Sequence, residues 1–209
     1  MAKLPTKNHP FYGGIDPGFT GAIALMNQAG TDVRVWDMPI SGTGREREID
    51  LPGLRQVFKH LRRMPDCAVG LEWPTTRPGE GAERSERFGR GKGYLEAFAF
   101  LMGLDCYKLA PNLWKRRLGV PGKSDKEANK IGARLFEDYY PEHATLIRGP
   151  RGGIKSGCLD ALLIAHFLRT SSYQGMKAVV EKFGKGSPEA MALCMRAGRR
   201  GSKKLKGII

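Results

Sequence analysis

The 209-residue sequence lacks any long apolar run, and its first ten residues lack the apolar segment of a secretion signal. Its longest apolar stretches, such as ALLIAHFL, are far shorter than the roughly 20 residues that cross a bilayer. The N-terminal sequence MAKLPTKNHP is polar and basic. We therefore expect a cytoplasmic protein that does not use a membrane as a partner.

Cysteines are few and scattered. Cys67, Cys106, Cys158 and Cys194 stand singly, without a C-x-x-C pair and without zinc-ligand spacing to a histidine. This pattern excludes the common structural zinc sites and a disulfide framework. We expect reduced and mostly buried thiols, as is usual in the cytoplasm.

Acidic residues are scarce relative to basic ones: 21 Asp and Glu stand against 35 Lys and Arg, a net charge of +14. Such an excess favours a polyanionic partner, and nucleic acid is the first candidate. An acidic membrane surface is the second, but no basic helix with a strongly apolar face stands out. The charge therefore predicts a nucleic-acid-binding protein.

Strand and helix patterns alternate along the first 170 residues. Three strands come first, with Pro17-Gly18 as the turn between the first two. Helices and strands then alternate, and Ser124 with Glu127 forms a capping box. The predicted strands cover 11–16, 21–27, 33–38, 67–72 and 105–110, and the predicted helices cover 50–64, 94–101, 124–140 and 159–170. This order predicts an α/β fold with a mixed five-stranded sheet, an antiparallel meander plus parallel strands, flanked by helices.

Two segments fall outside these elements. Residues 74–93 are polar and rich in Gly and Arg, which predicts a long loop of functional interest. The end of the chain, RAGRRGSKKLKGII, is basic and predicts a solvated tail. We expect a folded domain over residues 1–172 and a basic C-terminal extension over residues 173–209.

Three acidic residues stand at the ends of apolar elements: Asp16 and Glu72 end strands, and Asp160 begins the last helix. Neighbouring strands lie about 4.8 Å apart, so Asp16 and Glu72 meet if their strands pair. A helix packed across that end would bring Asp160 to them. Clustered carboxylates resist ionisation unless a cation neutralises them, and Mg²⁺, for which Mn²⁺ can substitute, prefers oxygen ligands. On a basic chain this cluster predicts a metal-dependent nuclease.

Each acid also has an ordinary explanation. Asp160 could cap a helix, Glu72 could be a plain strand-end carboxylate, and Asp16 could be a turn residue before Pro17. The metal-site interpretation is favoured because the three acids occur in a suitable order within one plausible sheet.

Four segments together resemble the RuvC family of Holliday junction resolvases, particularly its small phage-type members. They are GGIDPGFTGAIAL, VGLEWP, PNLWKRRLGVPGKSDKEANKIGARLF and LDALLIAHF, and the similarity spans roughly residues 11 to 170. The resemblance implies an RNase H-like fold in the folded domain. It also implies a Mg²⁺-dependent homodimer that cuts two opposing strands of a four-way DNA junction, in a bacterial or phage-infected cell and without a nucleotide cofactor.

The resemblance also assigns residues. It implies that Asp16, Glu72 and Asp160 are catalytic metal ligands and that Lys115 lies near the active centre, where it can meet the scissile phosphate. The family usually supplies a fourth acid or histidine shortly before the last aspartate. Here that stretch is Lys-Ser-Gly-Cys-Leu (155–159). Either water or Ser156 takes the fourth place, or the chain has diverged from the family at this position and from its full two-metal geometry.

Basic residues gather in two segments, WKRRLGVPGKSDK and the predicted loop 74–93. The first surrounds a predicted helix N-terminus, whose free N–H groups favour phosphate. The second is where a dimeric resolvase would touch the junction centre, and Trp73 or Phe88 could stack there on an unpaired base. The alternative is a solvated basic face, and Trp73 could equally be a core residue. The expected DNA contacts are Arg77, Arg84, Arg87, Phe88, Arg90, Lys92, Lys115, Arg116, Lys123 and Lys126.

Other interpretations stay open. The helices around 94–102 and 159–168 could form a dimer interface, or they could simply be buried. GIDPGFTG also resembles the first phosphate loop of actin-like ATPases and sugar kinases, but those proteins need two such domains and this chain is too short. The more serious alternatives are a non-catalytic junction-binding module and an RNase H-like nuclease acting on other branched DNA or on RNA–DNA hybrids.

Overall fold

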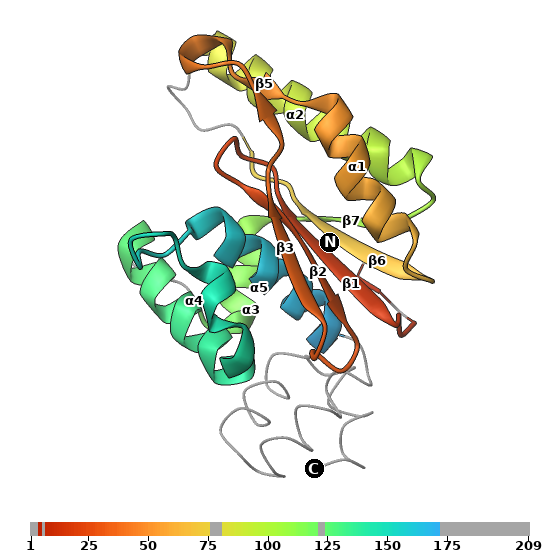
Figure 1. Cartoon of the computed structure of the whole chain (residues 1–209), viewed down its shortest axis with the longest axis vertical. Helices are drawn as coiled ribbons and strands as arrows, with labels where there is room; N and C mark the ends of the chain where they lie inside the picture. The colour runs from red at the N-terminus through yellow and green to blue at the C-terminus, as the bar shows by residue number, and fades with distance from the viewer. Residues whose placement is uncertain (1–3, 6, 76–80, 121–123, 172–209) are drawn as a thin grey trace.

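The computed structural model describes residues 4–5, 7–75, 81–120 and 124–171. Within these ranges five strands form one sheet in the order β3-β2-β1-β6-β7, as Figure 1 shows. The strands are β1 (Phe11–Asp16), β2 (Ala22–Asn27), β3 (Val33–Asp37), β6 (Cys67–Glu72) and β7 (Asp105–Leu109). The first three pair antiparallel, and β6 and β7 continue the sheet in parallel. This confirms the predicted mixed sheet, whose meander followed by parallel strands is the RNase H-like arrangement.

Helices cover both faces of the sheet. They are α1 (Leu51–Arg62), α2 (Ala82–Leu101), α3 (Pro111–Leu118), α4 (Asp125–Tyr139) and α5 (Ser156–Ser171). Helix α5 lies directly on β1, β2 and β6, with α3 and α4 beside it, whereas α1 and α2 cover the other face (Figure 1). A short hairpin of β4 (Ile40–Ser41) and β5 (Glu48–Ile49) precedes α1, the 3-10 turn η1 (Gly44–Glu46) lies between its strands, and η2 (Pro141–Ile147) follows α4.

Alternation along the strands creates a separate apolar core on each face. Tyr12 and Ala24 belong to the core beneath α5, whereas Ile15 and Ile23 belong to the core beneath α1 and α2. Successive side chains of a strand point to opposite faces, so a strand buried on both faces is apolar almost throughout. No helix within the described ranges is both long enough and apolar enough to cross a bilayer.

The predicted loop over 74–93 is wrong for its second half, because α2 already begins at Ala82. The glycines of this segment weaken its helix signal in the sequence. Two ion pairs at i,i+4 spacing support the helix, Glu83 with Arg87 and Glu86 with Arg90. Gly91 allows the helix to pack closely on the hairpin, because a Cβ there would lie 3.1 Å from Ile49 Cδ1. Residues 76–80, and with them the predicted contact Arg77, lie outside the described residues.

Several smaller expectations also changed. Helix α3 was not predicted; it is only two turns long and ends at Gly119, whose φ of +70° favours glycine. Asp50 occupies the N-cap position of α1, but its side chain makes no capping hydrogen bond. One of the two hydrogen bonds of the predicted capping box is confirmed, since Ser124 Oγ accepts from the Glu127 N–H at 3.3 Å. The predicted extension over 173–209 lies outside the described residues.

Candidate active site

The ends of β1 and β6 bring two of the predicted acids to one edge of the sheet. The strands pair in parallel with Ile15 opposite Leu71, so Asp16 and Glu72 follow at the same level. Gly14 and Gly70, two residues earlier, both lie against α5. Because side chains alternate between faces, Asp16 and Glu72 project toward the face that α5 covers.

Gly14 allows α5 to come close enough to add the third acid. A Cβ at this position would lie 2.0 Å from the carbonyl oxygen of Ala161 and 2.6 Å from the nitrogen of Ala165, so the strand and the helix touch backbone to backbone. Asp160 immediately precedes Ala161, and its side chain is only 19% exposed. Asp160 lies in the second turn of α5, which excludes the alternative of a helix cap.

The three carboxylates are electrostatically coupled. Burial raises the pKa of Asp16 to about 6, and the charge of Asp160 adds to the shift, while the Gly18 N–H, 3.2 Å from Asp16 Oδ1, opposes it. Burial raises the pKa of Glu72 to about 7, followed in size by the charges of Asp16 and Asp160. Burial likewise raises the pKa of Asp160. This mutual repulsion is relieved when a cation binds among the carboxylates.

Helix α3 supplies a partner for two of these acids. Trp114 Nε1 donates to Glu72 Oε1 at 3.0 Å, and Lys115 Nζ donates to Asp160 Oδ2 at 3.0 Å. Burial by itself lowers the pKa of Lys115, but the neighbouring carboxylates outweigh it and raise the pKa, so the ammonium stays charged. Lys115 is among the residues expected at the site, whereas Trp114 is not, because nothing in the sequence marks that indole as a partner of Glu72.

Carboxylates of this kind fit a hard divalent cation, since Mg²⁺ is usually bound by a few carboxylates together with water and substrate phosphate. In the described part of the chain, however, Asp16, Glu72 and Asp160 do not bring three ligand atoms within 4.8 Å of one another. Lys115 holds one oxygen of Asp160, and Trp114 holds one of Glu72. The site is therefore a set of coupled acids with a built-in cation rather than a closed ligand cage.

A second group of ionisable side chains lies at the opposite end of the sheet. His9, Asp66 and Asp105 precede or begin β1, β6 and β7, and their ligand atoms come within 4.8 Å of one another, so they could hold a metal ion. Lys7 already serves this group as a cation, with Nζ 2.8 Å from Asp66 Oδ1 and 3.5 Å from Asp105 Oδ2. No sequence pattern marks this group, because its three residues come from separate segments of the chain.

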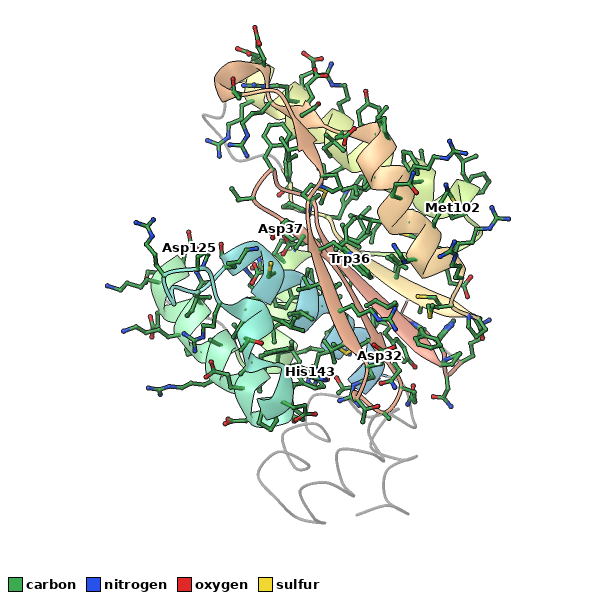
Figure 2. All side chains as sticks on the ribbon, viewed as in Figure 1. Asp32, Trp36, Asp37, Met102, Asp125 and His143 are labelled. Carbon is green, nitrogen blue, oxygen red and sulfur yellow. The ribbon has the colours of Figure 1, made fainter. Side chains whose placement is uncertain are left out.

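Two further acids belong to the surroundings of the predicted site. Asp125 is the first residue of α4, and its charge raises the pKa of Asp160. Asp37 ends β3 and is aligned with Asp16 through Ala22 on the strand between them. Figure 2 labels both acids, Asp125 on α4 and Asp37 at the end of β3. Asp37 is engaged by Lys155, with Nζ 2.7 Å from Oδ2.

Gly157 stands three residues before Asp160, in the stretch where the resemblance implies a fourth ligand. A Cβ at residue 157 would lie 2.0 Å from the carbonyl oxygen of Thr20 and 2.7 Å from Gly21 Cα, so no side chain fits there. On either side of it, Lys155 and Cys158 both bond to Asp37. Ser156 begins α5 and is exposed, and its role as a fourth ligand stays a prediction.

Besides Lys92 and Lys115, the predicted DNA-contacting residues fall into three groups. Arg84, Arg87, Phe88 and Arg90 lie on α2, and Arg90 is bound to Glu48 at 2.8 Å. Arg116 on α3 and Lys126 on α4 are exposed. Lys123, like Arg77, lies outside the described residues.

Lys92 is placed differently from the expectation. Lys92 is 8% exposed, and its Nζ bonds to the carbonyl oxygen of Pro74 at 3.0 Å and lies over the rings of Trp73 and Phe88. Lys108 Nζ lies 4.1 Å from the centre of the Trp73 ring. The burial of Lys92 argues against a direct phosphate contact and indicates that it holds these rings in place.

Helix α5 does not offer the interface that was considered for residues 159–168. Its apolar side chains, Leu159 and Leu162 among them, are buried in the monomer between the sheet and α4. Helix α2, by contrast, ends in two exposed apolar residues, Phe100 and Leu101, which are 81% and 73% exposed.

Comparisons with known proteins give structural matches only. No protein-family model matches the chain, and no curated protein matches it. One similar structure is Thermus thermophilus RuvC in complex with a Holliday junction substrate, with 19% sequence identity and a TM-score of 0.47, covering 81% of this chain and 98% of that chain. Another structure of Thermus thermophilus RuvC is 21% identical, with a TM-score of 0.43, covering 75% of this chain and 93% of that one.

Proposed function

We propose that this chain is a Mg²⁺-dependent endonuclease that resolves four-way DNA junctions by cutting paired phosphodiester bonds. The observation that carries the proposal is the coupled set of Asp16, Glu72 and Asp160 at one edge of the sheet, with the Lys115 ammonium on Asp160. The net charge of +14 supports a polyanionic substrate. A four-way junction is proposed as the substrate because four segments of the sequence resemble junction resolvases.

In this proposal Asp16, Glu72 and Asp160 bind the metal. Bound Mg²⁺ would supply an activated water for attack on phosphorus and charge stabilisation for the leaving 3′ oxygen. Asp16 is oriented for this role by the Gly18 N–H, and Glu72 by the indole of Trp114. Lys115 offers a positive charge to the scissile phosphate while it holds Asp160.

The proposal includes a homodimer, because two opposing cuts in a nearly two-fold symmetric junction call for two identical sites in matching orientation. Phe100 and Leu101 at the end of α2 support this part of the proposal, since they leave apolar side chains in water that a second copy could cover.

The decisive experiment is cleavage of a synthetic mobile four-way junction, with the products mapped on each strand. We expect paired cuts on opposing strands, 5′-phosphate ends and no cutting when EDTA replaces Mg²⁺. Labelled fork, linear duplex and RNA–DNA hybrid serve as competitors. Cutting of these substrates in preference to the junction would shift the proposal to another RNase H-like nuclease.

A non-catalytic junction-binding module is the second candidate, and two observations favour it. The backbone of Thr20 leaves no room for a side chain at residue 157, and the three acids do not bring their ligand atoms within 4.8 Å of one another in the described structure. Tight junction binding in Ca²⁺, together with no product in Mg²⁺ or Mn²⁺, would establish this second function.

A further inference from the structure

A pocket of about 500 Å³ lies beside the candidate active site. The elements that line it are the β1–β2 turn, the β4–β5 hairpin, the segment after β6 and the first half of α2. Two aromatic rings, Phe19 and Phe88, and three arginines, Arg47, Arg84 and Arg87, are among the lining residues, and no carboxylate is.

The pocket and the acids lie at the same edge of the sheet but on its opposite faces. Pro17 lines the pocket and directly follows Asp16, and Pro74 lines it two residues after Glu72. Phe19 packs on the core beneath α1 and α2, whereas Asp16 and Glu72 project toward α5. A strand that crosses this edge with one phosphate at the acids therefore brings a neighbouring nucleotide to the mouth of the pocket.

The walls of the pocket are held in place by contacts of the lining residues with one another and with their neighbours. Arg90 on α2 bonds to Glu48 on β5 at 2.8 Å, and Gly91 packs closely against Ile49, which fixes the hairpin to the helix. On the hairpin, Arg47 lies over the Phe19 ring, 5.4 Å from its centre. Across the pocket, the buried Lys92 lies 5.0 Å from the centre of the Phe88 ring. Because the walls are already held in place, little conformational entropy is lost when a ligand enters the pocket.

The lining combines the two chemistries that recognise a nucleotide. Flat aromatic rings stack on any nucleobase, and arginine binds phosphate oxygens through a planar set of donors. The volume falls within the usual range of small-ligand sites. We propose that the pocket receives one unpaired nucleotide of the bound DNA strand, next to the phosphate at the acids, with its base against Phe19 and its phosphate on the arginines. This inference rests on the proposed DNA substrate and extends it to a separate subsite.

The test uses the full-length protein and a four-way junction that carries 2-aminopurine at one position at a time around the crossover, with Ca²⁺ in place of Mg²⁺ to prevent cleavage. Phe19→Ala removes the ring, and Arg84→Ala removes an exposed arginine with little risk to folding. Phe19→Tyr retains stacking, and Arg134→Ala on α4 is the matched control for a lost exposed arginine.

We expect one labelled position to change fluorescence strongly on binding to the wild type, to Phe19→Tyr and to Arg134→Ala. The change should be lost in Phe19→Ala and reduced in Arg84→Ala. Loss of one base–aromatic stack should weaken junction binding by about 5- to 150-fold. If no position responds, or if Phe19→Ala and Arg84→Ala both bind like Arg134→Ala, the inference is wrong.

Two further results separate this inference from the proposed function. A position-specific signal that depends on Phe19, in a protein that never cuts the junction in Mg²⁺, supports the pocket and contradicts the nuclease. Normal cutting of the junction in Mg²⁺, with no effect of the pocket variants, supports the nuclease and contradicts the pocket. Thymidine 5′-monophosphate is titrated in parallel; if it binds at micromolar concentration through Phe19 while DNA gives no signal, the pocket takes a free nucleotide and the inference about the DNA strand is overturned.

Discussion

Trp114 donates its indole N–H to Oε1 of Glu72 across 3.0 Å, and both side chains are buried at the end of the sheet. The bond joins α3 to β6, two elements that are far apart in the chain. It restricts the orientation of the Glu72 carboxylate. The neighbouring residue Lys115 restricts the Asp160 carboxylate in the same way. Helix α3 therefore acts as a frame that holds two of the three proposed metal ligands.

Replacing Trp114 with Phe keeps a buried ring and removes the donor. Groups that orient metal ligands typically contribute 10- to 100-fold to metal affinity or activity, so we expect Mg²⁺-dependent cleavage to fall by about that factor. Much of the loss should be recovered at high Mg²⁺ if Glu72 is only misoriented. Trp36→Phe is the matched control, because Trp36 lies on β3 and stacks on His60. Equal cleavage by both variants would remove Trp114 from the site.

Replacing Asp16 with Asn should abolish junction cleavage and leave junction binding nearly intact. Asn preserves the size of the side chain and the possible hydrogen bond from Gly18, but it removes the charge that a metal ion requires. Cleavage is measured in Mg²⁺ and binding by gel shift in Ca²⁺. Turnover at the wild-type rate would disprove the catalytic role of Asp16.

The metal-free protein should lose stability as the pH rises from about 4 to 7. Folding raises the pKa of Asp16 from 3.8 to about 6 and that of Glu72 from 4.5 to about 7, mainly through burial. The folded state therefore holds protons that the unfolded chain has already released, and this contribution is complete below about pH 4 and lost above the folded pKa values. Thermal melts in EDTA across this range measure it.

A double variant, Asp16→Asn with Glu72→Gln, isolates this contribution because it removes both titrations. Its melting temperature should depend less on pH than that of the wild type, and the two should differ most at neutral pH, where the variant is the more stable. Added Mg²⁺ should stabilise the wild type at neutral pH and leave the variant unchanged. Parallel curves for the two proteins in EDTA would contradict the coupled acidic site.

Replacing Gly157 with Ala should destabilise the protein and disturb the site, because the new Cβ would lie 2.0 Å from the Thr20 carbonyl oxygen. Overpacking of this kind costs about 1–3 kcal/mol. Chemical denaturation measures the loss. Gly153→Ala is the control, since a Cβ there meets nothing within 4 Å. A Gly157→Ala protein as stable as this control would show that α5 can move away from the β1–β2 turn.

Junction binding should weaken steeply with salt, because contacts between basic side chains and phosphates release counterions. For an interface with six or more phosphate contacts, affinity falls by about 10³-fold between 50 and 200 mM salt. Fluorescence anisotropy of a labelled junction measures the slope. A flat response would contradict an interface dominated by phosphate contacts.

The acids of the candidate site could be named from the sequence, because their positions follow from local patterns. Asp16 stands at the end of an apolar strand before a turn, and Glu72 ends another strand, both as the structure has them. The first half of α2 could not be foreseen in the same way. Its glycines weaken the local helix signal, and the contact that makes Gly91 useful, with Ile49, comes from a different part of the chain.

What the sequence determined by itself is therefore local: where the strands end, where the turn at Pro17-Gly18 lies and which acids stand at element ends. Periodicity and turn chemistry act over a few residues, so they can be read without the fold. Tertiary structure alone decided that β1 pairs with β6, that Trp114 reaches Glu72 and that no side chain fits at Gly157. These relationships depend on distances between segments far apart in the chain, and only packing of the whole domain sets them.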